Sequence, residues 1–468
     1  MDKSKLTRRS FLAGAAATIA AGCTTTKGKA PAKISVKSPN EMVNFAAIAC
    51  GGKGGSDVNG ALEAGCNLVA LCDVDKNNPG KWMNAWNQNP KNEKKYENIP
   101  SYQDYRIMLE KHKDIDAVNV STPDHMHAMI AIHAMNMGKH VYVQKPLAHS
   151  IEECRMMEAV AKKNKVATQM GNQGHCGDGV REVCELIWAG AIGDVKKVVT
   201  WTDRPIWPQS IPEPLPAEPV PDYLDWNVWL GGAPFRDYNK GYAPFNWRGW
   251  WDFGCGALGD MACHIMDPAN WALTLGVPTS VEVVMQEGCN TQTGPDKSVL
   301  KYEFPERMGE HGKKFPAVSL EWWDGRAGNN PPPRPEGIPA DYELGSERGK
   351  CGTLFYGSKG MLTCGTYGQK PRLLPEADFA SYKKPAQSIA RLEDEDPYLD
   401  WVKSIKSGKP SASNFSYAAP FTEIILLGNL ALRAGTSIQW DIKNMKVTNS
   451  AEADKLVRKT YREGWKLG

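Results

Sequence analysis

Short apolar runs alternate with amphipathic helical patterns from residue 43 onward. The runs VNFAAIAC at 43–50 and NLVALCDVD at 67–75 have the character of strands buried on both faces, and a helical pattern over 57–64 separates them. The alternation continues with a strand at 115–121, a helix at 126–137 closed by Gly138, and a strand at 140–144. This order predicts an α/β fold that begins with a doubly wound parallel sheet.

A glycine-rich turn follows the first predicted strand. Glycines there allow a tight turn that brings backbone N–H groups close to a pyrophosphate, which the helix N-terminus then stabilises. The G-x-G-x-x-G frame has one departure, because Ala49 occupies the first glycine position. The residues that we expect to contact the pyrophosphate are Gly51, Gly52, Lys53 and Gly54.

An acidic residue ends the second strand. Asp73 is placed to accept hydrogen bonds from an adenosine ribose, and its charge would repel a 2′-phosphate. Strand, glycine turn, helix, strand and acid together form the dinucleotide-binding (Rossmann) unit. The sequence therefore predicts NAD as cofactor and favours it over NADP.

Two further strand ends carry polar residues. The carboxyl ends of parallel strands face the ligand crevice of an open sheet, so Thr122 and Lys145 are expected at the same rim as the glycine turn. That position places Lys145 beside the nicotinamide. The rim residues that we predict to contact the cofactor are Ser121, Thr122, Pro123, His127, Gln144 and Lys145.

Ordered motifs carry a family resemblance. The motifs are ACGGKG with Asp73, STPDHMH, QKPLAHS and GALGDMACHIMD. Together they resemble the glucose-fructose oxidoreductase and inositol dehydrogenase (Gfo/Idh/MocA) family over almost all of the chain after residue 42. Two residues depart from the family pattern: Gln144 stands where a glutamate is usual, and His175 where an arginine is frequent.

The resemblance implies a catalytic set of Lys145, Asp260 and His264. Oxidising a carbinol requires a base for the hydroxyl proton, and a lysine can be that base when burial and a nearby cation favour its neutral form. A histidine can take or relay a proton near neutral pH. Residues four apart on a helix share a face, so Asp260 is predicted to hydrogen-bond His264 and fix its tautomer. Asp267 is a weaker candidate that supports the helix.

The resemblance also implies a C-terminal α/β domain with a large open, mostly antiparallel sheet, and a homo-oligomer. The strands predicted for this sheet are 195–202, 280–286, 300–304 and 317–322. Seven prolines exclude a helix or a central strand from 205–221, which we expect to be an ordered surface loop or lid. The predicted divisions of the chain are a signal at 1–23, a disordered tether at 24–42, an NAD-binding domain at 43–165, a substrate and oligomerisation domain at 166–445, and a tail at 446–468.

Tryptophans gather around the proline-rich segment. They are Trp201, Trp207, Trp226, Trp229, Trp247, Trp250 and Trp251. Core packing explains part of this set, and the remainder is expected to stack on the flat C–H faces of sugar rings. The weaker candidates for substrate contact are Asn172, His175, Trp250 and Trp251.

The N-terminus contains a twin-arginine pattern, TRRSFL at 7–12, followed by an alanine-rich run at 13–21. This run is shorter than the roughly 20 residues of a membrane span and is typical of a signal peptide. Twin-arginine signals are read as export addresses. Because AAGC at 20–23 resembles a lipoprotein cleavage box, we predict a periplasmic protein whose only membrane contact is a lipid anchor at Cys23.

Charge and cysteine content exclude other classes of protein. The net charge is +3 from 56 basic and 53 acidic residues, which gives no field for nucleic acid or a membrane surface. The twelve cysteines form no C-x-x-C pair, which disfavours a zinc module and a disulfide scaffold. His125, His127 and His133 lack the carboxylate or cysteine spacing that would complete a metal site, so no metal is predicted.

Export restricts the chemistry, because NAD lost outside the cytoplasm is not replaced. We therefore predict an oxidoreductase that acts on a sugar or glycoside carbinol with a tightly bound cofactor. One alternative is redox-neutral, NAD-dependent cleavage of a glycosidic bond through transient oxidation at C3. A second alternative is a glycan-binding lipoprotein with a vestigial cofactor fold, which Ala49 and Gln144 favour and the catalytic set disfavours.

Overall fold

The structure is a computed structural model that describes residues 42–468, except 310–311, 327–331, 340–341 and 347–349. The predicted signal, its lipidation site at Cys23, and the tether up to residue 41 lie outside the described residues. Residues 42–468 form one compact unit.

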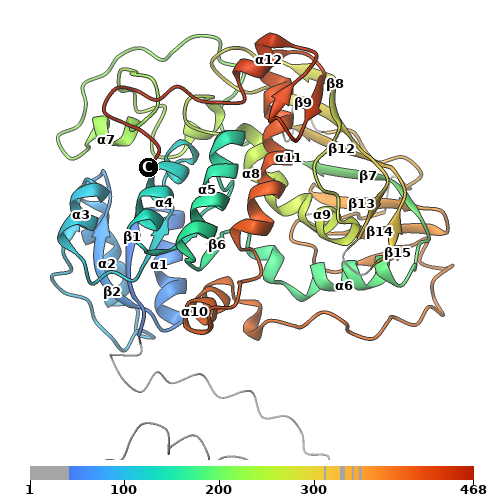
Figure 1. Cartoon of the computed structure of the whole chain (residues 1–468), viewed down its shortest axis with the longest axis horizontal. Coiled ribbons are helices and arrows are strands. Elements are labelled where there is room, and N and C mark those ends of the chain that lie inside the picture. The colour runs from blue at the N-terminus through green and yellow to red at the C-terminus, as the bar shows by residue number, and fades with distance from the viewer. Residues whose placement is uncertain (1–41, 310–311, 327–331, 340–341, 347–349) are drawn as a thin grey trace, which may run out of the picture. The chain divides into compact units, whose positions relative to one another are not determined.

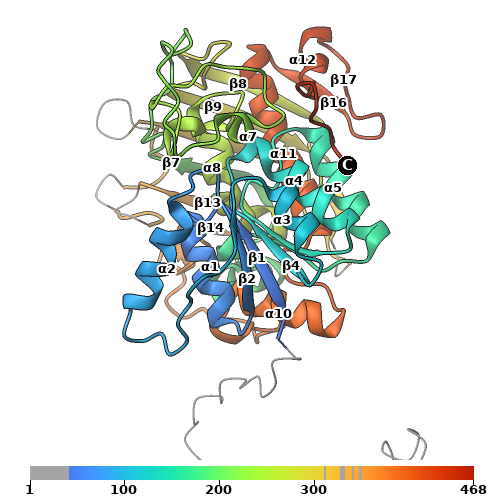
Figure 2. The ribbon, with the colours of Figure 1, turned by 90° about the vertical axis from the view of Figure 1, so that its left-hand side faces the viewer.

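The first sheet has six parallel strands in the order β3-β2-β1-β4-β5-β6. Figure 2 shows β2, β1 and β4 next to one another. The strands are β1 (Asn44–Ile48), β2 (Asn67–Cys72), β3 (Ser101–Tyr102), β4 (Ala117–Val120), β5 (His140–Val143) and β6 (Thr168–Met170). This order reverses direction beside β1, as in doubly wound dinucleotide-binding sheets. The predicted parallel sheet is confirmed.

Helices cover both faces of this sheet. They are α1 (Lys53–Glu63), α2 (Asn78–Gln88), α3 (Tyr105–Lys111), α4 (His127–Asn136), α5 (Ile151–Asn164) and, from much later in the chain, α10 (Pro397–Ser407). Successive side chains of a strand point to opposite faces. Phe45 and Ala47 accordingly pack in the core with α1 and α10, whereas Ala46 and Ile48 pack in the core with α4 and α5. Both faces are buried, which explains the continuous apolar runs.

Helix α1 begins earlier than the pattern at 57–64 predicted. It starts at Lys53, so Gly54 belongs to the first helical turn and not to the preceding loop. A Cβ at Gly54 would lie 2.2 Å from the Ala49 carbonyl oxygen. The glycine therefore allows the helix to approach the end of β1 closely.

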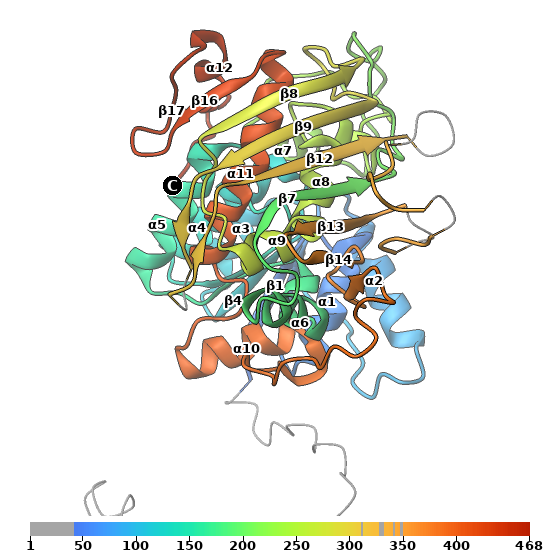
Figure 3. The ribbon, with the colours of Figure 1, turned by 90° about the vertical axis from the view of Figure 1, so that its right-hand side faces the viewer.

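The second sheet has nine strands in the order β15-β14-β13-β7-β12-β9-β8-β16-β17 (Figure 3). The strands are β7 (Val195–Thr202), β8 (Ser280–Glu287), β9 (Lys297–Phe304), β12 (Val318–Gly325), β13 (Gly352–Gly357), β14 (Gly360–Cys364), β15 (Arg372–Leu374), β16 (Ile438–Asp441) and β17 (Lys446–Val447). Only β7 and β12 pair in parallel. The predicted large, mostly antiparallel sheet is confirmed, and its predicted strands extend by a few residues.

Several helices lie between the two sheets or at their edges (Figure 1). The remaining elements are α6 (Asp178–Trp188), α7 (Trp226–Leu230), α8 (Gly256–Ile265), α9 (Asp267–Leu273), α11 (Phe415–Ala434), α12 (Ala451–Lys455) and a small hairpin of β10 (Arg307–Met308) and β11 (Lys314–Phe315). Helix α11 is long and apolar enough to cross a membrane, but 83% of its most apolar 18-residue stretch is buried inside the protein. We assign it to the core.

The proline-rich segment 205–221 contains no helix or strand, as predicted. Its continuation closes over the end of β2, where Asp225 N donates to Val74 O at 2.9 Å and Lys76 N donates to Tyr223 O at 3.0 Å. The division into domains at 165 stays a prediction. The first sheet continues to β6, helix α10 returns to it, and the predicted tail contains β17 and α12.

Candidate functional site

The glycine turn after β1 keeps the backbone that its motif requires. Ala49, at the first glycine position, has φ 67°, which is the left-handed region that favours glycine. Gly52 caps α1 with φ 52°, and a Cβ there would meet no atom within 4 Å. The turn is thus formed in spite of the alanine, with open space beside Gly52.

Asp73 holds this turn from the end of β2. Its Oδ2 accepts from Cys50 N at 3.0 Å and Gly51 N at 3.3 Å, and its Oδ1 accepts from Asp75 N at 3.0 Å and Asn78 Nδ2 at 3.1 Å. Burial raises the pKa of Asp73, while these hydrogen bonds act in the opposite direction. The predicted contact with ribose stays a prediction, and the structure adds a second role as the acceptor that shapes the glycine turn.

His127 joins two segments of the rim. Its Nδ1 lies 2.7 Å from the carbonyl oxygen of Pro146, and its Nε2 lies 2.9 Å from that of Thr122. Because the imidazole is buried, it positions the backbone on both sides of the crevice and does not point into it. Ser121 donates to Asp57 on α1 at 2.6 Å, and Gln144 donates to the same carboxylate at 2.9 Å.

The rim fits a dinucleotide. Thr122 Oγ1 is completely buried without a hydrogen-bond partner among the described residues, and the turn has room beside Gly52. A buried hydroxyl normally has a partner, so Thr122 is suited to a ligand. The residues that would hold NAD are Gly51, Gly52, Lys53, Thr122, Pro123, Gln144 and Lys145.

Lys145 is paired with Asp260. Its Nζ donates to Asp260 Oδ1 at 2.7 Å and to the Asp260 carbonyl oxygen at 2.9 Å, and 17% of each side chain is exposed. Arg248 Nε lies 3.4 Å from the same Oδ1. Burial alone would raise the pKa of Asp260, but the charges of Lys145 and Arg248 outweigh burial and lower it to about 2. Asp260 is therefore the counter-charge of two cations.

The predicted hydrogen bond between Asp260 and His264 is wrong. His264 Nδ1 is buried without a partner in the described part of the chain, because Asp260 turns toward Lys145. Burial, followed by the Lys145 charge, lowers the pKa of His264 to about 3. His264 is thus an uncharged imidazole near neutral pH and not a group that titrates there, as the sequence had suggested.

Asp124 is a member of the site that sequence reasoning missed. Burial raises its pKa to about 7, while Arg248 and Lys145 act to lower it. Its Oδ2 accepts from Cys255 N at 3.0 Å, directly before α8. The only sequence signal was its place after Pro123 at the rim, and nothing local showed its burial.

The other predicted substrate residues support the walls of the site. His175 Nδ1 lies 3.0 Å from Asp267 Oδ2, and Tyr417 donates to the same carboxylate at 2.5 Å. Asn172 accepts from Ser413, while its Nδ2 is buried without a partner in the described structure. Asp267 therefore fixes the orientation of His175, while Asn172 Nδ2, like Thr122 Oγ1 and His264 Nδ1, is left for a ligand.

The expectation that tryptophans stack on sugar is wrong for the set named from the sequence. All seven are buried; Trp250 is 1% exposed and packs against Tyr242, and the Trp251 indole donates to Asn290 O at 3.0 Å. A ring this deeply buried has little free face for a sugar, although Trp226 also borders the cavity beside α7. Trp226, Trp229, Trp247 and Trp250 pack with one another in one apolar cluster, and Trp201 packs in the core of the second sheet.

Two other aromatic rings border the catalytic set and are exposed. Phe245 is 44% exposed, and its ring centre lies 4.6 Å from the Arg248 guanidinium. Tyr367 is 40% exposed and meets His264 edge-on at 4.9 Å. Neither residue had a sequence signal, because exposure depends on how distant segments pack.

The histidines that raised the question of a metal have other contacts. His125 lies 3.0 Å from the Trp229 carbonyl oxygen, His127 joins the rim segments, and His133 packs edge-on against Tyr105. Among the residues that the structure describes, no group of three or more His, Cys, Asp or Glu could hold a metal ion.

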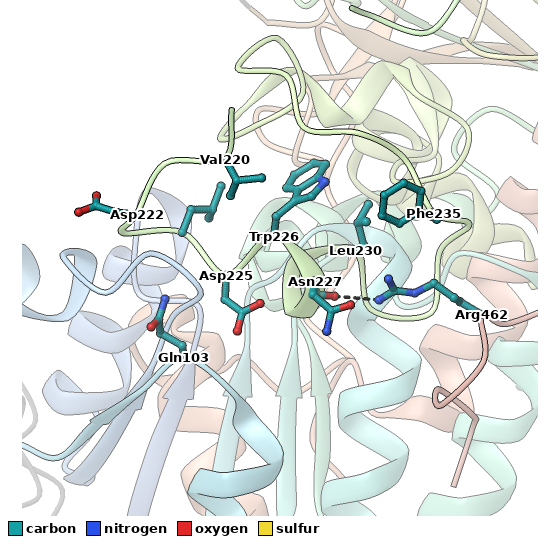
Figure 4. A pocket seen from close by; sticks show the side chains of 10 residues that line it. Gln103, Val220, Asp222, Asp225, Trp226, Asn227, Leu230, Phe235 and Arg462 are labelled. Atoms are coloured by element: carbon teal, nitrogen blue, oxygen red, sulfur yellow. Dashed lines mark hydrogen bonds between the residues drawn. The ribbon is translucent and has the colours of Figure 1, made fainter. Parts of the chain in front are cut away.

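A cavity of about 470 Å³ lies beside α7 (Figure 4). It is lined by Gln103, Val220, Asp222, Leu224, Asp225, Trp226, Asn227, Leu230, Phe235 and Arg462. Arg462 closes one side by donating to Asn227 O at 2.9 Å. Lys145, Asp260 and His264 are not among its lining residues, so the cavity and the ion pair at Lys145 are separate features.

Curated relatives match parts of the chain. A glycosyl hydrolase family 109 protein of Solibacter usitatus is 34% identical over 203 residues, which are 42% of this chain and 45% of that protein. The levoglucosan dehydrogenase of Pseudarthrobacter phenanthrenivorans is 30% identical over 178 residues, 38% of this chain and 37% of that enzyme. The matched regions thus span less than half the length of these relatives.

Solved structures share the fold at low identity. The WlbA dehydrogenase of Bordetella pertussis, in complex with NADH and UDP-GlcNAcA, has a TM-score of 0.56 and 14% identity, and the match covers 86% of this chain and 99% of that one. A levoglucosan dehydrogenase in complex with NADH and levoglucosan has a TM-score of 0.55 and 17% identity, covering 85% and 99%.

Family models match two successive segments of the protein. The model described as "Oxidoreductase family, NAD-binding Rossmann fold" matches residues 45–172. The model described as "Oxidoreductase family, C-terminal alpha/beta domain" matches residues 180–303. Together they cover more than half of the chain. This chain belongs to the Gfo/Idh/MocA family of NAD-binding oxidoreductases.

Proposed function

We propose that this protein oxidises a carbinol of a sugar or glycoside and keeps its NAD tightly bound. The observation that carries the proposal is the pairing of Lys145 with Asp260 beside the buried, uncharged His264. This group stands at the rim of the NAD-binding sheet, where Thr122 offers an unpartnered hydroxyl. A proton acceptor, its counter-charge and a neutral hydrogen-bonding group are thus assembled at one place.

Each residue has a separate task. The carbinol loses its hydroxyl proton and, from the same carbon, a hydride, and so becomes a ketone. Lys145 takes the proton, and Asp260 stabilises the ammonium that results. NAD, when bound, supplies the acceptor for the hydride.

The neutral groups orient the substrate. His264 Nδ1 is buried and unpartnered in the described chain, so it can hydrogen-bond a second hydroxyl of the sugar. Buried polar atoms that lack a partner in the free protein favour a ligand that satisfies them. Asn172 Nδ2 is a second atom of this kind.

The mouth of the site suits a carbohydrate. Phe245 and Tyr367 offer exposed aromatic faces for the C–H groups of a sugar ring, and Arg248 offers donors for its oxygens. The levoglucosan dehydrogenase to which the chain is similar is named for a sugar substrate, which supports the same class here.

Redox-neutral cleavage of a glycoside is the second candidate, favoured by the 34% identity to a glycosyl hydrolase family 109 protein. Oxidation at C3 would acidify the adjacent C–H bond, and loss of that proton would expel the glycosidic alcohol. Addition of water, with return of the hydride and the proton, would complete a net hydrolysis.

Residues outside the described structure motivate proposals about where the protein acts. The twin-arginine pattern at 7–12 supports export to the periplasm, and Cys23 supports a lipid anchor. Tight cofactor binding follows from that location, and we also propose a homo-oligomer. Cell fractionation of the unmodified protein and of Cys23→Ser tests the location, since loss of the anchor should release the protein from membranes. Light scattering tests the oligomer.

The cofactor itself gives the most direct test. The full chain, purified without added NAD, should release about one NAD per chain on denaturation. A 3-deuterated glycoside should then show a primary isotope effect, and the product, a keto sugar or a free hydrolysed sugar, separates oxidation from cleavage. A chain that releases no NAD and converts no sugar would support the glycan-binding alternative instead.

A further inference from the structure

A buried carboxylate joins the segments around the cofactor rim. Asp57, on α1, is 0% exposed. Its donors are Gln144 Nε2 at 2.9 Å, Ser121 Oγ at 2.6 Å, Tyr398 OH at 2.5 Å and Lys53 Nζ at 2.7 Å. Gln144 and Ser121 directly follow β5 and β4, and Tyr398 and Lys53 belong to α10 and α1, so one side chain connects the elements that surround the glycine turn.

The carboxylate decides how the amide of Gln144 is turned. An ionised carboxylate only accepts hydrogen bonds, so it selects the NH₂ end of an amide. Nε2 of Gln144 lies 3.1 Å and 2.9 Å from the two oxygens of Asp57. The oxygen Oε1 therefore points away from Asp57. It forms no hydrogen bond within the described chain, and it is not among the fully buried unpartnered atoms.

Gly171 holds the amide in this plane. A Cβ at that position would lie 2.6 Å from Gln144 Nε2 and 3.0 Å from Oε1. The amide thus lies flat against the glycine backbone after β6. Gln144 directly follows β5, so Oε1, turned away from Asp57, lies at the carboxyl end of this strand and thus at the rim of the sheet.

We propose that Asp57 is a positioning residue that presents Gln144 Oε1 to a hydroxyl of the bound dinucleotide. The inference rests on NAD binding at this rim and not on the identity of the sugar. Gln144 in this arrangement is an acceptor whose orientation is set by a second residue. The pair Asp57 and Gln144 therefore acts as a unit, and neither side chain is replaceable alone.

Exchange of the two groups provides the test. Gln144→Glu places a second carboxylate about 3 Å from Asp57, where like charges repel. Asp57→Asn removes the preference for the NH₂ end of the Gln144 amide, because an asparagine side chain can both accept and donate hydrogen bonds. The double variant Asp57→Asn with Gln144→Glu restores one donor facing one carboxylate, with the positions exchanged. Gln144→Met keeps the length of the side chain, adds no charge and removes the acceptor.

The measurement is the dissociation constant for NAD of the full chain after removal of bound cofactor, with the Tm of each cofactor-free variant. We expect Gln144→Glu, Asp57→Asn and Gln144→Met to weaken binding about tenfold or more, consistent with loss of a buried polar contact. The double variant should return to within about threefold of the unmodified protein, a coupling that a double-mutant cycle isolates. The exposed Gln439→Glu on β16 is the matched control and should change nothing.

The pH dependence of NAD binding gives an independent readout. A protonated carboxyl at position 144 can donate to Asp57 and keep its other oxygen as acceptor, as Gln144 does. The NAD affinity of Gln144→Glu should therefore improve as the pH falls from 8 toward 5. The NAD affinity of Gln144→Met should not show this improvement, because methionine does not titrate. The proposal is overturned if Gln144→Glu binds NAD as tightly as the unmodified chain, if the losses in the double variant simply add, or if the unmodified chain does not bind NAD.

Discussion

Lys145 Nζ and Asp260 Oδ1 lie 2.7 Å apart although 115 residues separate them in the chain. Lys145 follows β5 of the first sheet, and Asp260 stands on α8 between the sheets. The ion pair therefore exists only when both parts of the protein are folded around the rim. Its charge balance explains why two cations, Lys145 and Arg248, can lie side by side in a largely buried place.

Removal of Lys145 should abolish chemistry without unfolding the site. Lys145→Ala is expected to lower turnover by roughly 10²- to 10⁴-fold, the usual contribution of a general acid or base. Lys145→Arg should rescue little, because a guanidinium does not give up its proton. NAD released per chain should change little in both, because the other six rim residues that would hold the cofactor are still present. The exposed Lys162→Ala on α5 is the control, and near-normal turnover of Lys145→Ala would refute the catalytic role.

Asp124 should make stability depend on pH. Burial raises its pKa in the folded chain to about 7, whereas an exposed aspartate titrates near 3.9. The folded chain thus binds this proton more tightly than the unfolded chain. The resulting stabilisation is complete below about pH 4 and is lost as the pH rises through about 7. Urea unfolding between about pH 5 and pH 8 should show a smaller loss for Asp124→Asn than for the unmodified protein.

The same residue should set the activity profile near neutral pH. Burial lowers the pKa of His264 to about 3, so His264 does not titrate near pH 7. His264→Asn should therefore reduce turnover without shifting a transition of the activity near pH 7. Asp124→Asn should remove that transition, since the amide does not titrate. A transition that disappears with His264 and persists without Asp124 would reverse the assignment.

Ala49 should carry a conformational cost. Its φ of 67° is disfavoured for a residue with a Cβ by about 1–2 kcal/mol. Ala49→Gly is therefore expected to stabilise the chain by about 1 kcal/mol, visible as a higher Tm. Gly54→Ala is the contrasting change, because its Cβ would lie 2.2 Å from Ala49 O and should lower the Tm. An unchanged or lower Tm for Ala49→Gly would show that the strain is absent.

The exposed aromatic rings should govern substrate affinity. Phe245→Ala and Tyr367→Ala are expected to raise KM about tenfold with little change in kcat, because they remove contacts shared by substrate and transition state. Tyr367→Phe keeps the ring and should retain most of the affinity. Val284→Ala, an exposed change on β8, is the control. Unchanged KM values would place the sugar elsewhere.

Asp73 should affect the glycine turn and the choice of cofactor together. The unmodified protein is expected to bind NAD more tightly than NADP, since the carboxylate repels a 2′-phosphate. Asp73→Ser should weaken NAD binding and also lower the Tm, because Cys50 N and Gly51 N lose their acceptor. Equal affinity of the unmodified protein for NAD and NADP would contradict the expected cofactor preference. An unchanged Tm of Asp73→Ser would contradict the role of Asp73 in the glycine turn.

The hydrophobic pattern along the sequence was sufficient to predict the arrangement of strands in the first sheet. Apolar runs without alternation predicted strands buried on both faces, and their order predicted parallel pairing. Since parallel strands end at one edge, the positions of Gly51, Asp73 and Lys145 at that edge followed from the sequence alone. The proline count likewise excluded regular structure at 205–221.

The partners of the polar side chains were decided only by the tertiary structure. Helical spacing placed Asp260 beside His264, yet Asp260 binds Lys145, because a full positive charge attracts a carboxylate more strongly than a neutral imidazole. In the sequence, Gln144 was only a departure from the family motif. The structure supplies its partner, because its Nε2 lies 2.9 Å from a carboxylate oxygen of Asp57. Trp250 turned out to be buried and Phe245 exposed. Periodicity reports which face of one element is apolar, whereas burial and pairing depend on elements far away in the sequence, and these set the charge and hydrogen-bonding state of each side chain.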